Sequence, residues 1–133
     1  MASQFPESTS LPENIGELVS RHLAFHRSGD EKDEQASLFI STMTHTATPL
    51  TLWDLVLEIV RQSRDDKDLI AAVVAISRLL RHHCDVELLA RVEQQAVVDH
   101  KFARVLTGLG DFDVPAWAWS RIERMQVRVH DPL

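Results

Sequence analysis

Apolar residues recur at intervals of three and four positions along most of the chain, which is the spacing of one face of an α-helix. The first such series predicts a helix over about residues 11–27 and consists of Leu11, Ile15, Leu18, Val19 and Leu23. Ser28 and Gly29 are expected to end this helix, because glycine is common just after a helix C-terminus. The same spacing continues in the segments that follow, so the chain is predicted to be helical throughout.

Each later helix begins beside a residue that suits a helix N-terminus. These residues are Asp30 for the second helix, Thr48 with Pro49 for the third, Asp65 for the fourth, Asp85 for the fifth, Asp99 for a short sixth and Pro115 for a last helix to about Val127. Residues 110–113 are predicted to be a loop. Short connections favour antiparallel neighbours. The sequence therefore predicts an all-α fold, a compact bundle of six or seven short-to-medium helices in pairwise antiparallel packing.

The apolar run from Leu69 to Ile76 is compatible with a buried strand or with a helix. Its three alanines favour a helix, and a single strand in a helical chain would have no partner. We therefore assign the run to the fourth helix and expect a break or bend near Ser77. This helix and the third one, which ends near Gln62, leave little polar face, so both are expected at the centre of the bundle.

The length of 133 residues and a hydrophobic content of 44% are sufficient for one domain with its own core. We predict a flexible tail over residues 1–10, a single helical domain over 11–127 and a C-terminal tail over 128–133. Cys84 is the only cysteine, so no intramolecular disulfide is expected. The N-terminus lacks the pattern of a secretory signal, and no apolar run is long enough to cross a membrane. These features predict a cytoplasmic protein with no membrane contact.

Negative charge is concentrated in the first half of the chain. Residues 1–68 hold 12 acidic and 6 basic residues, whereas residues 69–133 hold eight of each, and the net charge is −6. Phosphate backbones would be repelled by the acidic half, which argues against direct binding to nucleic acid. A protein partner with a basic surface would be attracted to it.

Four acidic residues lie at the beginning of the second helix: Asp30, Glu31, Asp33 and Glu34. Carboxylates are favoured at this end of a helix because they cap backbone N–H groups and complement the helix dipole. Alternatively, the four residues form an anionic surface that binds a basic partner. Both interpretations remain open at this stage.

The last helix carries a tryptophan and three arginines along one stripe beside its apolar face. These residues are Trp117, Arg121, Arg124 and Arg128. Tryptophan and arginine are enriched at binding hot spots, and arginine forms bidentate bonds with carboxylates. The stripe is therefore a candidate partner-binding surface. Its partner is either another protein or a second copy of the chain, in which case the protein is a homodimer. The alternative is that the arginines pair with acids of the same molecule.

The sequence contains few groups that indicate catalysis. His22 and His26 lie one helical turn apart and could face one metal ion, with a carboxylate such as Glu58, but no third ligand is placed by spacing. The residues of the segment His82–Asp85 point in different directions on a helix, and Cys84 has no positioned base. We expect no catalytic residue, no cofactor and no tightly bound metal, and we regard an enzyme as the less favoured class.

One segment resembles a small helical bacterial family that is catalogued only as a domain of unknown function. The shared pattern is E-x-x-A-x-x-D-x-x-F-x-x-x-L, which corresponds to Glu93, Ala96, Asp99, Phe102 and Leu106. The resemblance extends over about residues 50–125, with one tryptophan near Trp53 and another near Trp117 or Trp119. It implies a helical fold and brings no known activity.

This chain departs from the family pattern at residues 75–78. The family has a Gly-Pro turn followed by an acidic pair, whereas the residues here are Ala, Ile, Ser and Arg. If the acidic pair is functional in relatives, this chain lacks that activity. Alternatively, the pair only caps a helix in those relatives.

The leading hypothesis is a non-enzymatic protein–protein interaction module of bacterial or phage origin. Toxin-neutralising immunity proteins and counter-defence inhibitors are typically small, acidic and helical, without reactive groups. Such a protein would occlude a basic active site with its acidic face. One alternative is a metal-dependent or small-ligand-binding protein that uses His22 and His26. Another is a homo-oligomeric scaffold that associates through the last helix.

Overall fold

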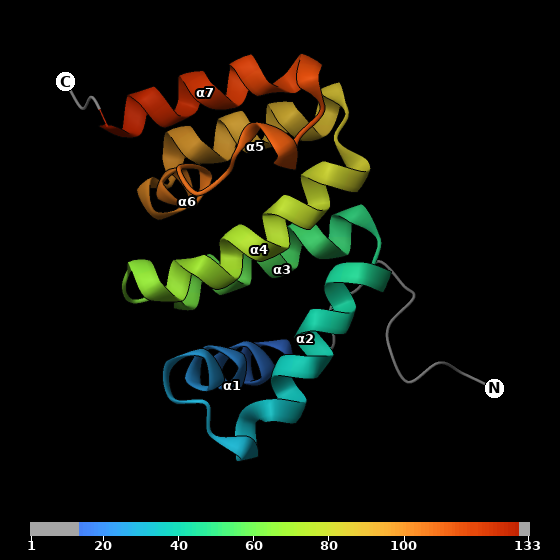
Figure 1. The fold of residues 1–133 in the computed structure, drawn as a ribbon, viewed down its shortest axis with the longest axis vertical. Coiled ribbons are helices and arrows are strands. Elements are labelled where there is room, and N and C mark those ends of the chain that lie inside the picture. The colour runs from blue at the N-terminus through green and yellow to red at the C-terminus, as the bar shows by residue number, and fades with distance from the viewer. Residues whose placement is uncertain (1–13, 131–133) are drawn as a thin grey trace. The chain divides into compact units, whose positions relative to one another are not determined.

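The computed structural model describes the backbone of residues 14–130 and the side chains up to Arg128 (Figure 1). This part of the chain contains α-helices, two short 3₁₀ helices and no β-strand. The helices are α1 (Ile15–Ser28), η1 (Glu31–Asp33), α2 (Glu34–Thr46), α3 (Pro49–Gln62), α4 (Asp66–His83), α5 (Val86–Val98), α6 (His100–Leu106), η2 (Asp111–Asp113) and α7 (Ala116–His130). The prediction of an all-α fold with six or seven helices is confirmed.

Most predicted helix boundaries agree with the structure because the capping side chains act locally. The side chains of Thr48, Asp65, Asp85 and Asp99 each accept a hydrogen bond from the backbone N–H three residues later. Asp30 instead caps η1, by accepting from the N–H of Lys32 at 3.1 Å, so the second helix starts with a 3₁₀ turn. Two further differences are that the predicted loop contains η2 and that α7 continues past Val127 to His130. The predicted tail of residues 1–10 and the start of the first helix at residue 11 lie outside the described residues.

The apolar run from Leu69 to Ile76 is helical, as predicted, but the expected break near Ser77 does not occur. α4 is one uninterrupted helix from Asp66 to His83. Within the described chain, no helix combines the length and the apolar character needed to span a membrane.

The helices group into two compact units, an N-terminal unit that ends at Ile76 and a C-terminal unit that begins at Ser77. In the N-terminal unit, α1 packs against α2 and α3. In the C-terminal unit, α5, α6 and α7 contact one another. α4 contributes its first part to one unit and its last part to the other, so it is common to both.

The core of the N-terminal unit depends on α3, which is buried around most of its circumference. Its buried residues are Thr51, Leu52, Trp53, Leu55, Val56, Ile59 and Val60. The core of the C-terminal unit includes Phe102, Leu89 and Ile122, which are fully enclosed. Apolar burial of this extent is the main favourable contribution to folding.

Three buried carboxylates are each paired with an arginine from another element. The pairs are Asp33 of η1 with Arg21 of α1, Asp68 of α4 with Arg27 of α1, and Asp113 of η2 with Arg81 of α4. Arg27 donates to both carboxylate oxygens of Asp68, at 2.9 and 2.6 Å, and this hydrogen bonding lowers the pKa of Asp68. An unpaired buried charge would cost several kcal/mol, so these pairs restrict how the helices can pack.

We predict that Ile59→Ala will lower the free energy of unfolding by about 2–5 kcal/mol, because the side chain is fully buried in α3 and its removal leaves a cavity. The measurement is equilibrium urea unfolding followed by circular dichroism. Ile70→Ala is the matched control, since Ile70 on α4 is 55% exposed and its truncation should change stability by less than about 0.5 kcal/mol. Equal effects of the two changes would contradict the assigned core.

Candidate functional site

α5, α6 and α7 of the C-terminal unit surround a groove with a volume of about 320 Å³. Its lining residues are Glu93, Ala96, Val97, His100, Ala103, Met125 and Arg128. The alanines, valine and methionine form an apolar surface, and the ionisable residues border it. A concave apolar surface with a few convergent polar groups is typical of binding sites.

The groove results from the sharp change of direction between α5 and α6. Asp99 alone separates the two helices, ending α5 and capping α6 through the N–H of Phe102 at 3.1 Å. Gln126 of α7 then donates to the backbone carbonyl groups of Leu106 and Leu109, at 2.8 and 2.9 Å. These bonds hold α7 beside the end of α6, and α7 contributes Met125 and Arg128 to the lining of the groove.

The arginine row on α7 contacts the carboxylate of Glu93 through Arg121. Arg121 donates two hydrogen bonds to Glu93 of α5, one from Nε to Oε2 at 3.0 Å and one from Nη2 to Oε1. The hydrogen bonds from Arg121 lower the pKa of Glu93, and the charges of Arg121, Arg124 and Arg128 lower it further. Glu93 is therefore ionised at neutral pH and lies in the field of three guanidinium groups.

Arg124 and Arg128 have no carboxylate partner of their own among the described residues. The Nε of Arg124 donates to the backbone carbonyl of Ser120 at 3.4 Å, which leaves its charge uncompensated. Arg128 is exposed and borders the groove. Three positive charges and one negative charge give this surface an excess of positive charge, which would attract an anionic group.

The family model of DUF6869, described as a family of unknown function, matches residues 26–130. The chain belongs to DUF6869. This membership confirms the resemblance to a domain of unknown function and extends it beyond residues 50–125. No curated protein and no solved structure matches the chain significantly. The DUF6869 region includes every residue that lines the groove.

The structure brings one of the predicted surfaces of this DUF6869 protein to the groove. Arg128 lines the groove, and Arg121 contacts Glu93, which also lines it. Trp117, at the beginning of the same stripe, is 50% exposed. Sequence reasoning missed the opposite wall. Its residues Glu93, Ala96 and Val97 have the spacing of one face of α5, which is the signal that could have identified them, whereas His100 begins α6.

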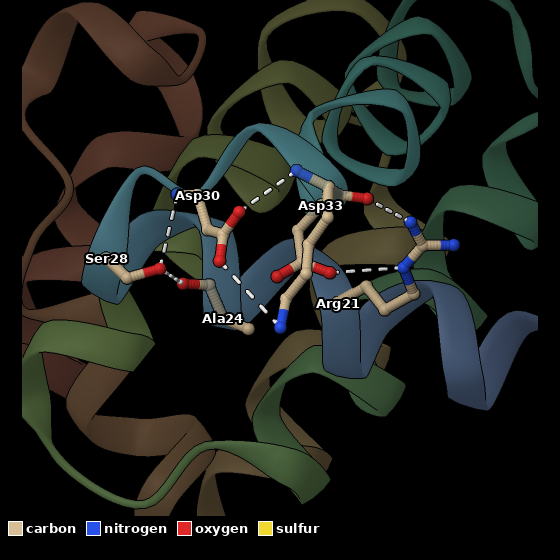
Figure 2. A network of polar contacts seen from close by, with 6 residues as sticks. Arg21, Ala24, Ser28, Asp30 and Asp33 are labelled. Atoms are coloured by element: carbon tan, nitrogen blue, oxygen red, sulfur yellow. Dashed lines mark hydrogen bonds and ion pairs between the residues drawn. The ribbon is translucent and has the colours of Figure 1, made fainter.

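The four acidic residues near the second helix have different roles (Figure 2). Asp33 is buried and accepts a hydrogen bond from Arg21 Nε at 3.1 Å. Asp30 caps η1 and forms an ion pair with Lys32 at 3.8 Å. Glu31 and Glu34 are exposed and form no ion pair with a described residue. Two of the four carboxylates thus serve the local structure, and two remain available at the surface.

His22 and His26 come together in the N-terminal unit, with ring centroids 4.6 Å apart. His22 is buried, its Nδ1 lies 2.9 Å from Ser37 Oγ, and burial followed by the charge of His26 lowers its pKa to about 4. The His22 ring is therefore neutral at neutral pH. Glu58, the carboxylate considered as a third metal ligand, is engaged by Arg61 and Gln62.

Two further groups considered from the sequence show no arrangement for catalysis. No cluster of three or more metal-ligating side chains exists among the described residues. Burial and then the charge of Asp85 raise the pKa of the Cys84 thiol, which disfavours the reactive thiolate. The ring centroids of His82 and His83 are 6.4 Å apart, with an angle of 65° between the ring planes.

We predict that the protein loses stability as the pH falls from 6.5 toward 4 because His22 is buried as a neutral ring. The pKa of His22 is about 4 when folded and 6.5 when unfolded, so the unfolded chain binds the proton first. The difference between the two pKa values lowers the free energy of unfolding by about 3 kcal/mol as the pH falls from 6.5 to 4. Urea unfolding at a series of pH values measures it, and His22→Gln should remove this part of the pH dependence. Identical pH profiles for the variant and the wild type would contradict the prediction.

Proposed function

We propose that this DUF6869 protein is a non-enzymatic protein-binding module whose groove between α5, α6 and α7 receives an acidic segment of a partner protein. The observation that carries the proposal is the charge imbalance at the groove: Glu93 offsets one of three guanidinium groups, and Arg128 borders the apolar surface without a carboxylate partner among the described residues. A carboxylate from outside the molecule would correct that imbalance.

The shape of the groove supports a short amphipathic segment as the occupant. Ala96 and Ala103 are small enough to allow close approach, and Met125 has a flexible side chain that adapts to different shapes. An amphipathic helix would place apolar side chains on this surface at intervals of three and four residues. Its acidic side chains would then lie against Arg124 and Arg128.

Exposed apolar residues of α5 and α7 favour a macromolecular partner. Val97 and Val98, at the end of α5, are 73% and 79% exposed, and Trp117 is half-exposed. Tryptophan and arginine often contribute most of the binding energy at protein interfaces. None of the seven lining residues is a serine, threonine, cysteine, lysine or tyrosine, and the carboxylate of Glu93 is held by Arg121. These features support binding and not covalent chemistry.

The acidic first half of the chain supports a second candidate, an inhibitor that binds a basic surface. Residues 1–68 carry a net charge of −6, and Glu31 and Glu34 are exposed without an ion-pair partner among the described residues. In this alternative, these glutamates would steer the protein toward the active site of a toxin or defence enzyme. Its ligands would be basic, whereas those of the groove would be acidic.

A selection of random peptides displayed on phage tests the proposal and separates the two candidates. We predict enrichment of peptides that combine acidic residues with apolar residues at helical spacing. Binding of a synthetic selected peptide, measured by isothermal titration calorimetry, should weaken by about tenfold or more with Arg128→Glu. Arg91→Glu is the matched control, because Arg91 is an exposed arginine of α5 that does not line the groove.

The charge of the selected peptides and the effect of each substitution distinguish the groove from the inhibitor hypothesis. Acidic peptides whose affinity is the same for wild type and Arg128→Glu would contradict the assignment of the groove. Basic peptides that bind wild type and lose affinity with Glu34→Lys would favour the inhibitor. A second copy of the chain is a third candidate for the occupant of the groove. In that case, light scattering should show a dimer that Arg128→Glu dissociates and Arg91→Glu does not.

A further inference from the structure

A second pocket, with a volume of about 170 Å³, lies in the N-terminal unit beside His22. Its polar lining consists of the two imidazoles of α1 and the hydroxyl-bearing residues Ser37, Ser41 and Thr44 of α2. Its apolar lining includes Ile59 of α3 and Ala75 of α4. The pocket therefore combines an aliphatic wall with hydrogen-bonding groups on one side.

His22 presents an available hydrogen-bonding atom to this pocket. Its Nδ1 contacts Ser37 Oγ at 2.9 Å, whereas its Nε2 forms no hydrogen bond with any described residue. Every fully buried side-chain nitrogen or oxygen in the described chain has a hydrogen-bond partner. The Nε2 atom is thus not fully enclosed by protein, although only 7% of the residue is exposed. His22 lines the pocket, so Nε2 is the nitrogen with which the ring would bind a ligand there.

The lining favours an uncharged ligand. None of its residues is an aspartate, glutamate, lysine or arginine, and the low pKa of His22 keeps that ring neutral at neutral pH. The other titratable group at the pocket is His26, which is exposed and contacts His22 edge-on. An ionic ligand would lose its hydration here without gaining a fixed opposite charge, which is unfavourable.

We propose that this pocket binds a small uncharged molecule with an apolar body of about one ring and one hydroxyl group. A cavity of about 150 Å³ is known to accommodate benzene, so 170 Å³ is sufficient for a ring of that size. If Ser37 donates to Nδ1, the proton of the ring is on Nε2, which is then a donor. If Ser37 accepts from Nδ1, then Nε2 is an acceptor. A hydroxyl group is complementary to both tautomers because it donates and accepts. The site is independent of the groove in the C-terminal unit.

Titration of the full-length protein with three single-ring probes, followed by NMR, tests the proposal. The signals to follow are the imidazole nitrogens of His22 and the methyl groups of Ile59 and Ala75. Phenol should produce saturable shifts at all three residues. Benzene, which lacks the hydroxyl group, should bind about tenfold more weakly. Benzoate, which is anionic at neutral pH, should produce no saturable shift.

Substitution of His22 separates hydrogen bonding from simple filling of space. His22→Phe retains a ring and removes both nitrogens, so phenol should bind this variant no better than benzene does. His82→Phe is the matched control in the C-terminal unit and should retain the preference for phenol. If His22→Phe does not fold, Ser37→Ala replaces it and should reduce the preference for phenol, because the ring loses the contact that orients it.

Three results would overturn the proposal. The first is the absence of saturable phenol shifts at millimolar concentrations. The second is equal affinity of the wild type for phenol and benzene, which would indicate an apolar cavity without hydrogen-bond recognition. The third is preferential binding of benzoate, which would indicate an anion site at His26.

Discussion

The packing of the helices depends on the need to neutralise carboxylates that are buried between them. The three pairs are Asp33 with Arg21, Asp68 with Arg27 and Asp113 with Arg81. Asp113 also accepts hydrogen bonds from Ser77 Oγ and the N–H of Gly110, at 2.6 and 2.8 Å. Burial alone would raise the pKa of Asp113, but these donors and Arg81 together lower it. Each pair fixes the position of one element against another, because separating it would leave a charge in a poorly solvated environment.

The same requirement shows which charged residues are available for binding. The fold uses Asp33 and Asp30, so the acidic cluster is less accessible than its sequence suggests. In the C-terminal unit, Glu93 neutralises Arg121, while Arg124 and Arg128 have no carboxylate partner among the described residues. Net charge is therefore a poor guide to the binding surface. The half of the chain with no net charge contains the surface with the clearest excess of positive charge.

Features that depend on near neighbours were predictable from the sequence, whereas those that depend on distant contacts were not. The caps at Asp85 and Asp99 involve a backbone N–H only three residues away, so helix starts could be located. In contrast, the pair of Arg27 and Asp68 joins residues 41 positions apart, and no local pattern specifies it.

The difference between local and long-range contacts also explains which parts of the candidate sites could be predicted. The arginine row followed from helical spacing, but its contact with Glu93 requires the packing of α5 against α7. Likewise, the spacing of His22 and His26 suggested a metal site, and only the structure shows that His22 is buried against Ser37. The expected break near Ser77 was wrong because the apolar face of α4 continues through Leu79 and Leu80, which are fully buried.

We propose that Arg124 and Arg128 serve binding and not folding. The most direct test is the free energy of unfolding of the double variant Arg124→Gln, Arg128→Gln at low ionic strength, compared with wild type and with Arg27→Gln. We predict that the free energy of unfolding of the double variant is within about 0.5 kcal/mol of the wild-type value, because both side chains are exposed and neither has a carboxylate partner of its own among the described residues. Arg27→Gln should lower the free energy of unfolding by about 1–3 kcal/mol, because the buried Asp68 loses two hydrogen bonds and keeps the one from the N–H of Arg64. A comparable loss in the double variant would contradict the claim.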